Sequence, residues 1–315
     1  MGHVTFPEYV ETFIEATNRY LGTFDAKLEE VSQHPKSQGR SYRISGKGDP
    51  IELLVHRTSR SLEQPVGEYR ARMNAVVRPG LADLLRGFED RVNRAATLGA
   101  LVTSEHDASV ICQCLIPSDS QDAAAGVLAA DFQDTVAGVL AAALVHARAS
   151  IIAALRRGLN QEPRPAIHSL SAWTDDHFEQ LQYHYPELDI RRVSVRYWGL
   201  PLLPHGELAL TAIDDNPYWG GGLLFQSRIP ERALAGDDRE VDVNELNLVA
   251  NLIDDTPTFG GWCRDNGVIF MQFIPNLLKG LPQVTELSIA WALRRALSVR
   301  RLVELGRETR PRDDG

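Results

Sequence analysis

Cys112 and Cys114, separated by one residue, are the first side chains in this sequence that could bind a metal. A structural zinc site normally takes four ligands, and no second Cys pair or His pair of suitable spacing accompanies them. In a strand, side chains two residues apart point to the same face. We therefore expect buried thiols that pack as small hydrophobic groups, and we predict no metal and no cofactor.

Two segments contain histidines that could take part in acid–base catalysis. Glu105-His106-Asp107 is one of them, but it fits the tip of a hairpin, where Asp has a structural role. His177 and His184 are the other, and their spacing places both on one helical face, where surface residues are the favoured interpretation. Neither a Gly-x-Ser-x-Gly elbow nor a His-Glu-x-x-His motif occurs. We predict that the protein is not an enzyme.

An aromatic pair followed by glycines is the strongest candidate for binding. Residues 214–222 read DDNPYWGGG, without the Gly-Lys-Ser/Thr ending of a phosphate loop. A wide turn or a β-bulge is the favoured interpretation of the glycines. Tyr218 and Trp219 beside them would form a patch that binds a partner protein, and Trp198 and Trp262 are candidates to extend it.

The composition excludes several classes of protein. With 43% hydrophobic and 24% charged residues, it is typical of a soluble globular protein. The net charge of -9 argues against general binding to nucleic acid or anionic membranes and is compatible with basic protein partners. No apolar run is long enough to span a membrane, and residues 1–21 do not have the pattern of a secretory signal. Three cysteines fit a reducing compartment, so we expect the cytoplasm.

Hydrophobic periodicity predicts the elements that would position these residues. The first part is predicted to contain helices over 7–21 and 79–92, strands at 41–45, 51–56 and 68–77, a hairpin over 98–116 and a long helix over about 123–155. The polar residues 22–40 are expected to form a loop or a helix extension. Residues 159–172 are the predicted linker. Beyond it we expect a helix over 175–185, strands at 190–198, 208–213 and 223–229, and a helix over 243–253 that Asp242 caps. A hairpin over 259–274 and a helix over 284–305 follow, and we expect Arg294 and Arg295 on the solvent-exposed face of that helix. Residues 307–315 are expected to form a disordered tail.

The chain contains a candidate internal repeat. Residues 101–117 align without a gap over residues 259–275, and Asp107 then matches Asp265 in the turn. The second hairpin also contains a turn signal, Asn266-Gly267, followed by an unusually continuous apolar strand. We predict an α+β protein with two similar α-β-β-β-α-β-β-α halves, over residues 1–158 and 173–306. Each half has an antiparallel sheet flanked by helices, and the two are in a pseudo-twofold arrangement.

This order of elements resembles the type III secretion chaperone fold, and more closely its bacterial YbjN-type relatives. Residues 206–231 (GELALTAIDDNPYWGGGLLFQSRIPE), residues 243–254 (VNELNLVANLID) and the hairpin ending in Phe-Ile-Pro carry the resemblance. It implies a family of small dimers that bind extended client segments on apolar patches and have no catalytic residues. We therefore expect a non-enzymatic chaperone or adaptor that binds a client protein, as a monomeric pseudo-dimer or a homodimer.

An enzyme or a small-ligand sensor is the alternative. Its site would lie in the cleft between the two halves, because ligand pockets favour domain interfaces. His106, His177 and Asp214 are the residues that would act there.

Overall fold

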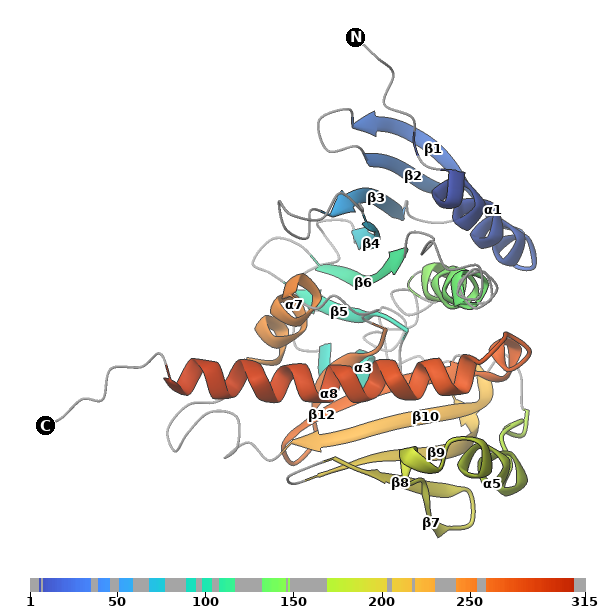
Figure 1. Ribbon diagram of the computed structural model, residues 1–315. Helices are drawn as coiled ribbons and strands as arrows, with labels where there is room; N and C mark the ends of the chain where they lie inside the picture. The colour runs from blue at the N-terminus through green and yellow to red at the C-terminus, as the bar shows by residue number, and fades with distance from the viewer. Residues whose placement is uncertain are drawn as a thin grey trace, which may run out of the picture.

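The described residues form two antiparallel sheets, each of six strands, and several helices, which makes this a mixed α+β protein (Figure 1). The computed structural model describes residues 6, 8–34, 39–45, 51–58, 68–76, 89–94, 98–103, 108–116, 132–145, 147, 169–202, 206–216, 219–229, 242–253 and 259–308. In Figure 1 the first sheet lies above the second, and α8 (Val284–Glu308) crosses the molecule between them.

The first sheet has the strand order β1-β2-β3-β4-β6-β5. Its strands are β1 (Lys27–His34), β2 (Gly39–Ser45), β3 (Glu52–Thr58), β4 (Glu68–Val76), β5 (Ala100–Thr103) and β6 (Ala108–Ile116). The helices of this part are α1 (Glu8–Gly22), α3 (Glu89–Arg94) and a helix over residues 132–145.

The second sheet has the strand order β11-β12-β10-β9-β8-β7. Its strands are β7 (Arg191–Ser194), β8 (Tyr197–Pro201), β9 (Glu207–Asn216), β10 (Gly220–Ile229), β11 (Gly261–Arg264) and β12 (Val268–Pro275). With it come α5 (Asp175–His184), η1 (Pro186–Leu188), α7 (Val243–Ile253), η2 (Asn276–Leu278) and α8. Each sheet therefore places four consecutive strands side by side and adds the next two in reverse order.

The prediction of three strands before the middle helix was wrong in both parts of the chain, because four are present. The polar segment 22–40 contains β1, an edge strand whose pairing with β2 is interrupted by a bulge between Glu30 and Ser32. The single strand expected over 190–198 is the hairpin of β7 and β8, which turns at Arg196 with a φ of 63°.

The hairpin predicted from Asn266 and Gly267 is present. These residues have φ values of 52° and 127°, and the carbonyl of Gly267 accepts a hydrogen bond from the backbone N–H of Asp265 at 2.9 Å. Every residue of β12 is buried, as its continuous apolar sequence predicted. Phe270 belongs to the main core, whereas Phe273 belongs to a smaller apolar cluster on the other face.

The gapless alignment of the two hairpins does not follow their strand pairing. Four residues separate the pair Thr103 and Ala108 in the first hairpin, whereas three separate the pair Arg264 and Val268 in the second. The match of Asp107 to Asp265 places strand residues of β6 over the turn residues of the second hairpin.

Helices cover one apolar face of each sheet. The Tyr20 hydroxyl on α1 donates to Asp134 Oδ2 of the helix over 132–145 at 2.5 Å, so these helices are adjacent. The Trp173 indole N–H donates to Thr285 Oγ1 at 3.0 Å, which joins the start of the second part to α8. Arg295 of α8 is fully buried, so the prediction that it lies on the solvent-exposed face of the helix was wrong. Among the described residues, no helix has the length and hydropathy needed to cross a membrane.

Residues 169–172, the described end of the predicted linker, are hydrogen-bonded to the second sheet. The Gly221 N–H donates to Ser169 Oγ at 2.8 Å, and Ser171 Oγ donates to the Gly222 carbonyl at 2.8 Å. A Cβ at position 221 would overlap the carbonyl of Leu170, so glycine is required there. The pairing of β9 with β10 shifts between Gly220 and Gly222, which confirms the predicted bulge. Arg307 and Glu308 of the predicted disordered tail belong to α8, so this part of the prediction was wrong, and residues 309–315 lie outside the described residues.

The two sheets meet at β5 and β11, with α3 and α7 packed against this junction. The Asn93 side chain of α3 accepts from the Leu101 N–H (2.8 Å) and donates to the Leu101 carbonyl (3.0 Å). The Asn247 side chain of α7 makes the same pair of bonds with Trp262, at 2.8 and 2.9 Å. Each asparagine therefore fixes the backbone of one edge strand.

Candidate functional site

Two of the predicted binding aromatics, Trp198 and Trp262, do not lie at the surface. Trp198 and Trp262 are 2% and 0% exposed, because their strands turn these side chains into the core. Trp198 stacks on Phe178 of α5 at 4.0 Å between ring centroids. Their expected place in an exposed patch was therefore wrong.

Trp219 is half-buried, and its ring meets Phe24 edge-on at 6.3 Å between centroids. Phe24 belongs to the turn after α1, so this contact joins the two parts of the chain. Tyr218 lies outside the described residues. Binding by Trp219 and Tyr218 stays a prediction.

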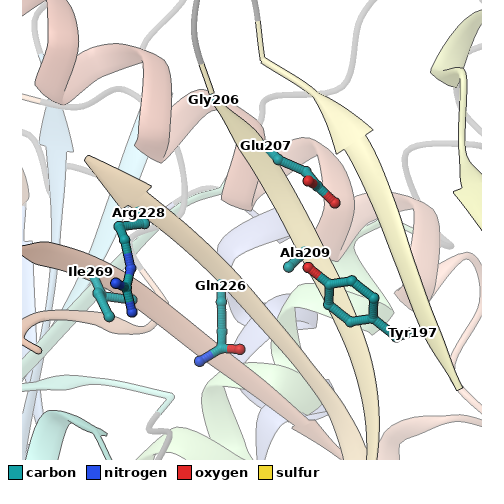
Figure 2. Close-up of a pocket in the computed structure, with 7 residues that line it drawn as sticks. All are labelled: Tyr197, Gly206, Glu207, Ala209, Gln226, Arg228 and Ile269. Carbon is teal, nitrogen blue, oxygen red and sulfur yellow. The ribbon is translucent and has the colours of Figure 1, made fainter. Parts of the chain in front are cut away.

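A hollow of about 480 Å³ lies on the face of the second sheet that points away from α5 and α8. We call it the β8–β12 hollow, and Figure 2 shows its side chains spread over four neighbouring strands. Its lining residues are Tyr197, Gly206, Glu207, Ala209, Gln226, Arg228 and Ile269.

Strand alternation positions these side chains. Leu208 and Leu210 of β9 face the main core, so Glu207 and Ala209 face the hollow. Ala209 pairs directly with Gly199 of β8, and the Glu207 carboxylate lies over Gly199, in room that a larger residue at position 199 would fill. Ile269, which is 4% exposed, provides an apolar floor.

The polar groups of the hollow are available to a ligand. Within the described part of the chain, the side chains of Glu207, Gln226 and Arg228 make no hydrogen bond or ion pair with the protein. Burial, and secondarily the charge of Glu207, raises the pKa of the Tyr197 phenol, so this group stays a neutral donor. The hollow thus offers a carboxylate, a guanidinium, an amide and a phenol to a bound molecule.

Asp214, named for the alternative function, is committed to an ion pair. Both of its carboxylate oxygens accept from the Arg196 guanidinium, one at 2.6 Å, and the Ser171 N–H donates to it at 2.7 Å. The Arg196 hydrogen bonds, followed by the Ser171 N–H, lower the pKa of Asp214 to about 2. A carboxylate this acidic is a poor general base near neutral pH.

His177, also named for the alternative function, lies against α8. His177 Nε2 is 3.3 Å from Thr285 Oγ1, and burial, with a smaller effect of Lys279, lowers its pKa. His106 lies outside the described residues. The structure therefore gives no contact that joins His177 with Asp214 among the residues it describes.

The cysteines are buried, as their strand positions predicted. Burial raises the pKa of the Cys114 and Cys263 thiols to about 12, and it raises the pKa of Cys112 as well. Neutral buried thiols pack as apolar groups. Within the described ranges, no three side chains of His, Cys, Asp or Glu gather as metal ligands would.

A second pocket, of about 330 Å³, lies at the junction of the two parts and is lined by Glu89, Asp90, Asp242, Val243, Asn244 and Arg264. Two of its three carboxylates, those of Asp90 and Asp242, already have structural roles. Asp90 accepts from the Arg264 N–H at 2.9 Å, and Asp242 caps α7 by accepting from the Asn244 N–H at 2.9 Å. The predicted cap at Asp242 is thereby confirmed.

No family model, curated protein or solved structure matches this chain. The resemblance to type III secretion chaperones and YbjN-type proteins therefore stays a prediction, as does the cytoplasmic location.

Neither aromatic residues nor catalytic motifs mark the β8–β12 hollow in the sequence. The alternation of polar and apolar residues along two strands does indicate it. In β9, the polar or small residues at 207, 209 and 211 alternate with buried apolar ones, and in β10 Gln226 and Arg228 alternate with Phe225 and Ser227. Two adjacent strands with polar outer faces indicate a sheet surface that stays open.

Proposed function

We propose that this chain is a non-enzymatic chaperone or adaptor that captures an extended segment of a client protein in the β8–β12 hollow. It is built from two similar α+β halves in a pseudo-twofold arrangement, as the resemblance to type III secretion chaperones and YbjN-type proteins implies. The observation that carries the proposal is the hollow itself, where polar groups without protein partners among the described residues surround a buried apolar floor.

The strand order favours two similar halves. In both sheets four consecutive strands are followed by two in reverse order, with a helix before the sheet, one between its fourth and fifth strands and one after its last. In each half the first helix lies beside a later one, through Tyr20 and Asp134 or through His177 and Thr285.

The junction supports the pseudo-twofold arrangement. Asn93 and Asn247 hold the backbones of Leu101 and Trp262 with the same pair of bonds. Two contacts then cross the junction: Asp90 of α3 accepts from the Arg264 N–H, and Asn244 Nδ2 of α7 donates to Thr103 Oγ1 at 3.3 Å. They are at matching positions, because Asp90 and Asn244 each lie three residues before the asparagine of their own helix. Arg264 and Thr103 each lie two residues after the residue that the asparagine binds. Reciprocal contacts of this kind are those of an isologous interface.

The dimensions of the hollow suit a short stretch of polypeptide. Three inter-strand gaps separate Tyr197 on β8 from Ile269 on β12, which corresponds to about 14 Å. An extended chain advances ~3.4 Å per residue, so about four residues would cross this distance. A client segment lying across the strands can therefore reach every lining residue.

Filling the hollow tests the proposal. Ala209→Leu would occupy the space beside Gly199, and we expect affinity purification to lose a stoichiometric partner that the wild type retains. The matched control is Leu54→Ala, which changes the same face of the first sheet and should keep the partner. Equal partner recovery from wild type and Ala209→Leu, with both folded by circular dichroism, would contradict the proposal.

A small-ligand sensor is the second candidate function, and the pocket at the junction favours it because both halves line it. Because Asp90 and Asp242 have structural roles, Glu89 would supply the charge for a cationic ligand. Native mass spectrometry of the purified protein tests this candidate. A bound small molecule that is lost in Glu89→Gln would support it, and a spectrum containing the bare chain alone would count against it.

A further inference from the structure

The outward faces of the two sheets carry different side chains at equivalent positions of the third strand. Glu52 begins β3 and Glu207 begins β9, and these are the third strands of their sheets. Directly opposite Glu52 lies Arg43, whose Nη2 is 3.4 Å from Glu52 Oε1. On the β8 side, the residue opposite Glu207 is Pro201, which carries no charge. The first carboxylate is therefore paired, and the second is available to a ligand.

The next outward-facing pair differs in size. In the first sheet Ser41 lies opposite Leu54, whereas in the second Gly199 lies opposite Ala209. A Cβ at Gly199 would overlap Oε1 of Glu207, so the carboxylate lies over β8 in the space that the glycine leaves. The side chains of Leu54 and Ser41 thus fill, in the first sheet, the position that forms part of the hollow in the second.

The two charges of the hollow point to opposite ends of it. Glu207 reaches over Gly199 toward β8, and Figure 2 shows its carboxylate on the same side of the hollow as the Tyr197 ring. Arg228 lies at the other end, beside Ile269 of β12, with Gln226 between the two ends. A bound segment thus meets an anion at the β8 end and a cation at the β12 end.

We infer that each chain binds one client segment, in the second half, and that this segment carries a basic and an acidic residue on the same face. The inference rests on the proposed function. The basic residue pairs with Glu207 and the acidic residue with Arg228, by charge complementarity. Glu207 and Arg228 lie on the adjacent strands β9 and β10. Side chains two or four positions apart on an extended chain point to the same face, so either spacing lets one segment meet both charges.

Selection from a phage-displayed library of random dodecapeptides tests the inference on the full-length protein. Against the wild type we expect enrichment of peptides with Lys or Arg two or four residues from Asp or Glu, in either order. Glu207→Gln should lose the basic preference and keep the acidic one, and Arg228→Gln should do the reverse. The matched control is Arg43→Gln in the first sheet, which should select the same peptides as the wild type.

Titration calorimetry with the most enriched peptide gives the affinity and stoichiometry. We expect one peptide per chain and about tenfold weaker binding in either Gln variant, as for the loss of one charge-assisted hydrogen bond. Enriched peptides without the charge pair, or two peptides per chain, would overturn the inference and leave the proposed function standing. If no peptide is enriched, both are overturned.

Discussion

Asn93 and Asn247 hold the two edge strands that meet at the centre of the molecule, and they do so through the same pair of side-chain bonds. Both side chains are fully buried. Each amide satisfies a backbone N–H and a carbonyl that the strand pairing leaves unused, which matters because unpaired buried groups are costly.

The first prediction concerns this junction. Asn247→Ala should lower the free energy of unfolding by about 2–4 kcal/mol, since the Trp262 N–H and carbonyl each lose a buried partner. Urea denaturation followed by tryptophan fluorescence measures the change. The neighbouring Leu248→Ala is the control, because Leu248 is 42% exposed and should shift stability by less than about 0.5 kcal/mol. Similar values for both variants would show that the asparagine bonds contribute little.

The second prediction concerns pH. The folded-state pKa of Asp214 is about 2, below its ordinary value of 3.8, so its pair with Arg196 stabilises the fold above pH 3.8. That contribution decreases as the pH falls and is lost near pH 2. The pair is partly exposed, so we expect Asp214→Asn to cost about 1 kcal/mol at pH 7.

Thermal unfolding of wild type and Asp214→Asn between pH 2 and pH 7 measures this effect. The difference in stability should be constant above about pH 5 and should vanish toward pH 2. A difference that does not change with pH would mean that the variant acts through packing.

The third prediction concerns the cysteines. The thiols of Cys112, Cys114 and Cys263 are buried, and their raised pKa values leave almost no thiolate at neutral pH. Ellman's reagent should react with fewer than one thiol per native chain in an hour and with all three after addition of denaturant. Rapid modification of the native protein would contradict the described burial.

The sequence predicted the elements that have a clear local signal, such as a turn dipeptide or a continuous apolar run. Asn266 and Gly267 accept the positive φ of the turn, and the apolar run after them marks a strand buried on both faces. It could not reveal β1, which has little hydrophobic alternation and is defined by its pairing with β2. The hairpin at Arg196 was hidden too, because its positive φ falls on a residue that rarely adopts one.

The candidate site was less predictable than the fold. Trp198 was expected at the surface from its residue type, yet its strand turns it onto α5, and only its neighbour Tyr197 faces the hollow. The hollow arises from what lies across the strands, such as Gly199 opposite Ala209. Cross-strand register depends on the whole sheet and cannot be read from a local motif.

Photo-crosslinking from the hollow tests the central claim most directly. A photoreactive benzoylphenylalanine at position 226 should yield one discrete crosslinked protein when cells that naturally make this chain are irradiated. The same residue at position 43, on the matching face of the first sheet, should yield none. Equal crosslinking from the two positions, or none from position 226, would contradict the account.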